Sequence, residues 1–513
     1  MNFKISIGVI FLLAITSLLP QPAVDANDTR PNVLFISIDD LNDWVGVFGG
    51  HAQVKTPNID AFAESGAVIF QNAHCAGPVC GSSRSALLSG FMPSTTGVYG
   101  NSQNMLDSKL VQANATLPEY FSKHGYRTLS RGKIFHKHAT AHGSDMGHWA
   151  FDHWEHAVGG TPVDQSKITS RNKNLIHGKP APVSDHTSPG GTEFAWGPTS
   201  AGKEETKDYR TAQWAASQLQ HQSEKPFFMA VGISRPHLPF FVPQEFIDLY
   251  DPANFKAPKI REDDLDDILV NGKHHAKHKP TPDYKWLKQN NLIDEAAMAY
   301  AAACSYADAC LGVIFEGLEK SPHKDNTIVV IWGDHGWHLG EKLRYRKTTG
   351  WRVSTRVPLL VRIPHMTQGQ DCPRLVNLID IYPSLIELCG LPKKPTLDGR
   401  SFAPLLTDPT QIWNHSSLTI FGNGNASVFN ERFHYMLYSD GTEEFYDLKS
   451  DPHEWSNLAK TLSPEQRNEK TQLAAIIPET FALNIKTSKN KFKKSAKNLN
   501  LKIKSQRVLE KLK

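Results

Sequence analysis

The stretch Asn32-Val33-Leu34-Phe35-Ile36-Ser37-Ile38-Asp39-Asp40 is a nearly continuous apolar run that ends in two acids. Such runs are typical of strands that are buried on both faces of a sheet. The pattern recurs at Phe227 to Val231, Thr327 to Trp332 and Val357 to Ile363. Helical patterns lie between these runs, for example at Ile59 to Ser65, which Gly66 follows. The alternation predicts an α/β fold with a large mixed, mostly parallel sheet between helices.

The pattern changes after Leu406. Ser417 to Phe421, Phe433 to Tyr438 and Glu444 to Asp447 read as short strands joined by Asn, Gly and Asp turns. They predict a small antiparallel sheet. We therefore expect a main domain over residues 27–408 and a smaller C-terminal α+β domain over residues 409–485.

Two long segments show no sustained period. Gly, His, Ser, Thr and Pro dominate from His136 to Ser200, and Arg261 to Pro280 is charged and then rich in histidine. Both are predicted loops, and loops of this length in a compact fold are usually functional. The cluster His274, His275 and His278 has residue types that bind transition metals, but a solvated loop explains it more simply.

The net charge of +4 hides an uneven distribution. The segment Lys486 to Lys513 carries ten Lys and one Arg against the single acid Glu510, so the rest of the chain is negative. This basic tail reads either as a solvated terminus or as a segment that contacts an anionic surface or polymer. The overall composition excludes collagen-like, wholly disordered and coiled-coil chains. We predict no nucleic-acid partner.

The N-terminus reads as a signal peptide over residues 1–26. A short basic lead, Met1 to Lys4, precedes an apolar run from Ile5 to Leu19, and Val24-Asp25-Ala26 offers small residues for cleavage. The run is shorter than the roughly 20 residues that a membrane-spanning helix needs. No later run looks long enough to span either. The sequence thus predicts a periplasmic or secreted protein without a membrane span.

Six cysteines do not make a disulfide scaffold in a chain of this length. They are Cys75, Cys80, Cys304, Cys310, Cys372 and Cys389. Cys304 and Cys310 lie on a helical pattern from Leu292 to Leu318, but six residues of separation do not place them on one face. If a bridge forms, Cys372 with Cys389 is the more plausible pair.

Two predicted strands end in carboxylates. Asp39 and Asp40 follow the first strand, and Asp334 with His335 follows the strand that ends near Gly333. Either group alone could cap the next turn. Open α/β sheets, however, bind ligands beyond the carboxyl ends of their strands, so the acids can converge. Three hard oxygen donors favour Ca²⁺ or Mg²⁺ over zinc.

A third feature is the segment Pro78-Val79-Cys80-Gly81-Ser82-Ser83-Arg84. A cysteine in such a place can simply be a small buried apolar residue. The residues after Cys80 can also form a helix whose N-terminus offers backbone donors to an anion, with Arg84 adding a guanidinium fork. Cys80 is therefore a candidate nucleophile position.

With these residues the chain resembles the type I sulfatases of the alkaline phosphatase superfamily, and most of all iduronate-2-sulfatases and bacterial polysaccharide sulfatases. The resemblance spans almost the whole mature chain. Its motifs are Pro31-Asn32-Val33, Cys80 to Arg84, Ser130-Arg131-Gly132-Lys133-Ile134-Phe135-His136, Arg235-Pro236-His237-Leu238-Pro239-Phe240, Gly333 to Glu341, Phe445-Tyr446-Asp447-Leu448 and Asp451-Pro452.

The resemblance implies that Cys80 is oxidised to formylglycine by a formylglycine-generating enzyme, and that the hydrate supplies the attacking oxygen. The family motif has Pro where this chain has Ser82. The implied metal ligands are Asp39, Asp40, Asp334 and His335 together with the modified Cys80. They would hold one Ca²⁺ per chain, with Mg²⁺ less favoured.

The resemblance also assigns the remaining catalytic residues. Arg84, Lys133 and Lys347 match the cations around the sulfate and the hydrate. His237 matches the acid that protonates the leaving alcohol, where negative charge develops as the sulfur–oxygen bond breaks. His136 matches the base that removes a proton from the sulfated hydrate, which expels sulfate and restores the aldehyde.

The function expected from the resemblance is exo-acting hydrolysis of sulfate esters on a saccharide, such as a glycosaminoglycan-like or ulvan-type oligosaccharide. Two alternatives stay open. One is a phosphate or phosphonate ester hydrolase of the same superfamily. The other is a binder of sulfated glycans, if Ser82 prevents maturation and Cys80 stays a thiol. Selectivity for the sugar is expected to reside in the His136 to Ser200 and Arg261 to Lys288 segments.

Overall fold

The architecture is built around one large sheet. The computed structural model describes residues 29–136, 147–157, 163, 167, 169–170, 194–268 and 279–486. The predicted signal peptide, the histidine cluster His274, His275 and His278, and the basic tail after Lys486 lie outside the described residues. Eight strands of the described chain form the sheet, in the order β13-β2-β12-β9-β1-β7-β3-β4. Their bounds are β1 (Asn32–Ile38), β2 (Val68–His74), β3 (Arg127–Gly132), β4 (His153–Glu155), β7 (Phe227–Ile233), β9 (Thr327–Gly333), β12 (Leu359–Arg362) and β13 (Gln370–Asn377).

β1 lies inside this sheet and pairs in parallel with β7 on one side and β9 on the other. Among the eight strands only β12 is antiparallel to its neighbours, β2 and β9. The predicted mixed, mostly parallel sheet is therefore confirmed. Parallel neighbours place the carboxyl ends of β1, β7 and β9 at the same edge of the sheet.

Successive side chains of β1 enter two different hydrophobic cores. Leu34, Ile36 and Ile38 pack into the core formed with α1, α6 and α9. Val33 and Phe35 pack into the core formed with α2, α5 and α11. All five side chains are completely buried, which contributes roughly 1.5 to 3 kcal/mol for each large one. Because strand side chains alternate between faces, the uninterrupted apolar run in β1 is what a sheet covered on both faces requires.

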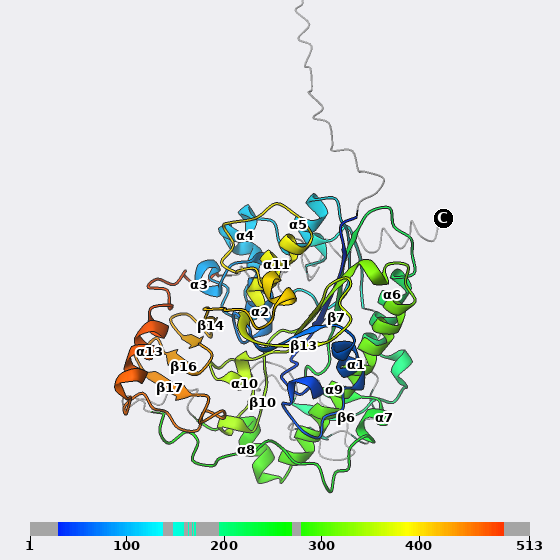
Figure 1. Ribbon diagram of the computed structural model, residues 1–513. Helices are drawn as coiled ribbons and strands as arrows, with labels where there is room; N and C mark the ends of the chain where they lie inside the picture. Colours follow the sequence, from blue (N-terminus) through cyan, green and yellow to red (C-terminus); the bar gives the residue numbers. More distant parts are fainter. Residues whose placement is uncertain are drawn as a thin grey trace, which may run out of the picture.

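Helices cover both faces of the sheet, with α1, α6 and α9 grouped together and α2, α4, α5 and α11 in a separate group (Figure 1). The helices are α1 (Pro57–Glu64), α2 (Cys80–Ser89), α3 (Pro93–Thr96), α4 (Lys109–Ala113), α5 (Leu117–Lys123), α6 (Lys207–Gln218), α7 (Gln244–Ile247), α8 (Pro282–Gln289), α9 (Ile293–Glu319), α10 (Arg352–Thr355), α11 (Ile381–Leu388), α12 (Ala403–Thr407) and α13 (Pro464–Ala474).

α9 corrects one expectation from the sequence. By length and composition it is apolar enough to cross a membrane, although no later run had looked long enough. Its apolar residues, many of them alanine, are mostly buried against the sheet, α6 and α1. A core helix that is packed on several sides has the same composition as a spanning helix.

Residues 417–447, late in the described chain, form a second, antiparallel sheet at the left of Figure 1. Its order is β14 (Ser417–Ile420), β15 (Ala426–Phe429), β16 (Phe433–Leu437) and β17 (Glu443–Asp447). Three of these strands were predicted. β15 was not predicted, because it has only four residues and directly follows the turn-forming run Gly422-Asn423-Gly424-Asn425. The side chains of this sheet pack against α13.

The described parts of the predicted loops also contain short strands. β4 extends the main sheet by pairing with β3. β5 (Thr169–Ser170), β6 (Ala195–Pro198) and β8 (Phe240–Val242) form a small separate sheet. A hairpin of β10 (His338–Leu339) and β11 (Tyr345–Arg346) follows β9. These strands are too short to leave a period in the sequence.

The suggested bridge between Cys372 and Cys389 is wrong, since all six cysteines are free thiols. Cys372 lies in β13 and Cys389 directly follows α11. Both side chains are buried among apolar residues of the same core. They act there as small apolar side chains.

Candidate active site

The acids at the ends of β1 and β9 converge. In the parallel register Ile38 lies opposite Gly333, so Asp39 and Asp334 leave the sheet side by side. The backbone of Asp40 turns into the left-handed region (φ 61°), and its N–H donates to Asp334 Oδ1 at 2.9 Å. Asp and Asn adopt this conformation more readily than most residues. The sharp turn is what brings the Asp40 carboxylate to the edge of the sheet.

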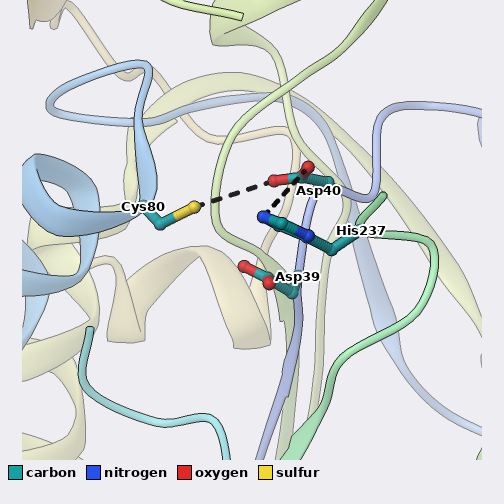
Figure 2. A group of neighbouring side chains, drawn as sticks. All are labelled: Asp39, Asp40, Cys80 and His237. Atoms are coloured by element: carbon teal, nitrogen blue, oxygen red, sulfur yellow. Dashed lines mark hydrogen bonds and ion pairs between the residues drawn. The ribbon is translucent and has the colours of Figure 1, made fainter. Parts of the chain in front are cut away.

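Cys80 is the first residue of α2, and its side chain is completely buried. Its Sγ lies 3.3 Å from His335 Nε2, 3.3 Å from Lys347 Nζ and 3.7 Å from Asp40 Oδ1. Figure 2 shows the thiol pointing toward Asp40, with Asp39 and His237 beside it. The structure thus unites segments that lie far apart in the sequence.

Ser82 fits the third position of this helix without strain. The first main-chain hydrogen bond of the helix runs from Ser83 N–H to Val79 O, so the amide of residue 82 needs no partner within the helix. A proline at that position would therefore remove no helical bond. The Ser82 hydroxyl donates instead to Val98 O at 3.0 Å. Ser82 is therefore compatible with the helix that presents Cys80.

Two overlapping groups of side chains can hold a metal ion. One is Asp39, Asp40, Cys80 and His237, and the other is Asp40, Cys80, Asp334 and His335. The Asp40 Oδ2 atom is buried and has no hydrogen-bond donor among the described residues. His335 Nδ1 donates to Gly336 O at 3.0 Å, which leaves Nε2 to face the cluster. A carboxylate oxygen that lacks a donor and an oriented imidazole both suit a cation.

The guanidinium of Arg84 is turned toward the acids. Nε lies 2.8 Å from Asp334 Oδ2, and Nη2 lies 3.1 Å from Asp39 Oδ1. Nη1 donates to Ser37 Oγ and to the main-chain oxygens of Lys133 and Ile134. These contacts use the donors of the Arg84 guanidinium, which was expected from the sequence to face an anion at the N-terminus of α2. In the structure Arg84 orients two acids of the cluster and does not contact the thiol.

Two lysines complete the ring around Cys80. Lys133 directly follows β3, where Gly132 has a φ of 85° and a side chain would meet Gly232 O at 2.0 Å. This close approach to β7 requires glycine and directs the Lys133 ammonium to Asp39. Lys347 contacts Asp40 and lies over the Trp337 ring.

The charges of the cluster shift several pKa values. Burial would raise the pKa of Asp39, but Lys133 and His237 hold it well below its ordinary value. Burial would likewise raise the pKa of the Cys80 thiol, yet Lys133 and Lys347 lower it to about 6. Burial would lower the pKa of His335, but Asp334 raises it to about 10. The site therefore stabilises an anion at position 80 and a cation beside the acids.

The two candidate acid–base histidines lie at different places. His237 Nδ1 donates to Leu238 O at 2.6 Å, and Nε2 lies 3.8 Å from Asp40 Oδ2. Its position is supported by Arg235, which donates to the main-chain oxygen of His237 at 2.9 Å. His136 is buried and follows Lys133 by three residues.

A cavity of about 270 Å³ opens in front of the cluster. Asp40, His237 and Lys347 contribute to its wall. The wall also contains residues that the sequence did not single out: Asn101, Thr281, Asp283, Arg344 and Arg346. Asn101 Oδ1 accepts a hydrogen bond from Gly81 N–H at 2.7 Å, at the start of α2. Two features of the sequence could have pointed to missed residues of the site. One is the cationic run around Lys347. The other is Ser37, a polar residue inside an apolar strand, which accepts a hydrogen bond from Arg84.

The fold matches that of known ester hydrolases. A phosphonate monoester hydrolase from Silicibacter pomeroyi superposes with a TM-score of 0.69 at 20% identity, over 87% of this chain and 94% of that one. At that identity the likeness shows the fold alone. The chain therefore shares the fold of that hydrolase.

Sequence comparison specifies the family. Residues 31–391 match the family model described as sulfatase, and residues 333–477 match N-sulphoglucosamine sulphohydrolase, C-terminal. A sulfatase of Formosa agariphila is 34% identical over 463 residues, which cover 88% of this chain and 87% of the relative. Iduronate 2-sulfatase of Mus musculus is 29% identical over 412 residues, covering 72% and 71%. The chain belongs to the sulfatase family and is a hydrolase of sulfate esters.

Proposed function

We propose that this sulfatase removes sulfate from a sulfated saccharide and that residue 80, matured from cysteine to formylglycine, carries the nucleophile. The observation that carries the proposal is the position of Cys80. Its Sγ lies at the start of α2, within 3.3 Å of both Lys347 Nζ and His335 Nε2. Once hydrated, the aldehyde supplies an attacking oxygen. Maturation requires a formylglycine-generating enzyme as partner.

The proposed metal is one Ca²⁺, held by Asp39, Asp40, Asp334 and His335 beside residue 80. The donor set is rich in hard carboxylate oxygens, which suit Ca²⁺ better than a transition metal, and Mg²⁺ is the second choice. The buried Asp40 Oδ2 without a hydrogen-bond donor supports the fit. When bound, the ion draws negative charge away from the reacting sulfate.

The cationic side chains have complementary proposed tasks. A sulfate monoester is an anion, so it must be neutralised before an oxygen nucleophile can approach sulfur. Lys133 and Lys347 supply positive charge at the pocket, and their side chains are 24% and 12% exposed. Arg84 is completely buried and keeps Asp39 and Asp334 in place, so we assign it a positioning task.

His237 is the proposed general acid. Because its Nδ1 donates to Leu238 O, the free nitrogen is Nε2, which faces Asp40 in the cavity. In the imidazolium form Nε2 donates its proton to the leaving alcohol oxygen. His136, after Lys133, is proposed as the base that takes a proton from residue 80 during release of sulfate.

The proposed substrate is an oligosaccharide derived from an acidic polysaccharide, attacked from its end. A relative named for iduronate supports a sulfated sugar. A cavity of about 270 Å³ suits one terminal sugar better than a chain interior. The N-terminal sequence supports export to the periplasm or beyond, and we propose no nucleic-acid partner and no membrane span.

The test is a screen of the matured enzyme against defined sulfated oligosaccharides, with sulfate release measured at chain ends and interiors. A phosphate and a phosphonate ester of one alcohol are assayed beside its sulfate ester, because the fold is shared with a phosphonate monoester hydrolase. We expect faster sulfate release, from ends only. Faster hydrolysis of the phosphorus esters would overturn the assignment, and equal release from interiors would overturn the exo mode.

A further inference from the structure

The cavity in front of Cys80 has a wall that the proposed chemistry does not fully use. Lys347 and His237 belong to the reaction, whereas Arg344 and Arg346 have no task in it. All four side chains line the same space of about 270 Å³. A sugar that presents its sulfate to Lys347 therefore places its other substituents within reach of this wall.

The wall carries more cations than acids. Its cationic side chains are Arg344, Arg346 and Lys347, and its acids are Asp40 and Asp283. Asp40 contacts Lys347, and Asp283 Oδ2 lies 2.6 Å from Arg346 Nε. A cavity wall of this composition favours a ligand that carries an anionic group besides the sulfate that reacts.

Arg344 is held by an unusual stretch of backbone. Lys342, Leu343, Arg346 and Thr348 all have positive φ values, between 51° and 77°. Side chains other than Gly, Asn and Asp rarely adopt this region, and such outliers persist only where the surroundings impose them. Together with the β10–β11 hairpin, these turns aim the cationic residues 344, 346 and 347 into one cavity.

Contacts of Lys342 and Arg344 hold this backbone in place. Lys342 Nζ lies 2.8 Å from Asp264 Oδ1 and between the rings of Trp351 and Tyr446, at 5.6 and 5.3 Å from their centres. The Arg344 guanidinium lies over the same Trp351 ring, at 5.7 Å. Arg344 is only 7% exposed, and burial lowers its pKa to about 10. A guanidinium that is already fixed and partly dehydrated loses little further entropy or solvation when it binds an anion.

We propose that Arg344 recognises a second oxyanion on the sugar that carries the scissile sulfate. The group is a carboxylate, as on a uronate, or a further sulfate ester, since both match the donor fork of a guanidinium. This inference rests on the proposed function, because it concerns the same cavity and substrate. It makes segment 342–348 a determinant of selectivity, beside the loops in which the sequence placed it.

The test compares wild type and Arg344→Gln on a 2-O-sulfated uronic acid glycoside and on its carboxyl methyl ester. We expect the variant to lose about 10- to 100-fold in kcat/KM on the acid, mainly through KM, and less than about 3-fold on the ester. Wild type should lose a similar factor between acid and ester. A second pair, a disulfated and a monosulfated galactoside, distinguishes sulfate from carboxylate as the recognised group.

Arg352→Gln is the matched control. Its pKa is also lowered to about 10 by burial, but it lines a different cavity, so it should leave both substrate pairs unaffected. Equal losses on acid and ester, or no loss on any substrate, would overturn the proposal. If Arg344→Gln does not fold, the test uses wild type alone, through the ratio of kcat/KM between the two members of each substrate pair. Ratios near one in both pairs would overturn the proposal. Absence of sulfate release from every substrate by matured wild type would instead contradict the proposed function.

Discussion

The Nζ atom of Lys347 lies 3.3 Å from the Sγ atom of Cys80 and also contacts the Asp40 carboxylate. One ammonium group thus touches both the residue proposed to carry the nucleophile and an acid of the candidate metal site. Such a bridging cation stabilises negative charge where the reaction creates it. Together with Lys133, which has the larger effect, Lys347 also lowers the pKa of the Cys80 thiol in spite of its burial.

Replacing Lys347 should therefore impair the chemical step. We expect Lys347→Ala to lower kcat on a sulfated sugar by about 10²- to 10³-fold, the range seen when one preorganised donor to a developing charge is removed. Steady-state kinetics measure the change. Lys256→Ala, which removes an exposed partner of Asp294, is the control and should keep wild-type activity. Comparable losses in both variants would argue against a specific task for Lys347.

Metal removal gives a second prediction. A chelator should abolish activity, and Ca²⁺ should restore it and raise the melting temperature, because an ion that binds only the folded state stabilises it. Asp334→Asn should weaken this thermal response by altering a carboxylate of the cluster. Differential scanning fluorimetry with and without Ca²⁺ records both effects. Full activity in chelator, with no thermal shift on adding Ca²⁺, would refute the metal assignment.

The proposed acid predicts a dependence on the leaving group. His237→Ala should lower kcat/KM on a sugar sulfate by about 10²- to 10⁴-fold, since an alkoxide leaves poorly without a proton. On 4-nitrophenyl sulfate, whose phenolate leaves readily, the loss should be much smaller. Parallel kinetics on the two esters provide the measurement. Identical losses would show that His237 does not act by proton donation.

A pH effect on stability is expected away from the site. Burial raises the pKa of Asp308 to about 6, although hydrogen bonds from Asn58 and Ile59 oppose the shift. The folded protein therefore retains this proton at pH values where the unfolded chain has lost it. The contribution of Asp308 to stability is present below about pH 4 and is lost as the pH rises through about 6.

Asp308→Asn removes this titration. The free energy of unfolding is measured in urea at pH 4 and pH 6.5. It should fall with rising pH in wild type, and the fall should be smaller in the variant by about 1 to 3 kcal/mol. Each protein is compared with itself at the two pH values. A loss of stability that does not depend on pH, caused by the altered contact with α1, therefore cancels. Parallel pH profiles in the two proteins would contradict the prediction.

Much of the fold follows from local sequence patterns. The run of β1 predicts a strand buried on two faces, and its side chains do enter two cores. The convergence of Asp39 and Asp40 with Asp334 could also be predicted, because parallel strands end at one edge. β15 and the short strands β4 and β6 could not, since each has only three or four residues and lies in a segment rich in Gly, Asn or His.

The direction of long side chains was the harder part of the site. The sequence places Arg84 one helical turn after Cys80, which suggested a fork facing an anion. Only the packed structure shows that Asp39 and Asp334 lie behind it and take up its donors. Arg344 and Arg346 enter the cavity because of positive φ values at non-glycine residues, which no residue pattern signals.

The central claim is that residue 80 becomes an aldehyde, and mass spectrometry of the peptide that contains it tests this most directly. The sample is protein from the native host, digested after treatment with a thiol alkylating reagent. The account predicts the mass of the formylglycine form, without alkylation, in most of the protein. An intact Cys80 thiol that takes up the reagent would contradict it and would favour a binder of sulfated glycans.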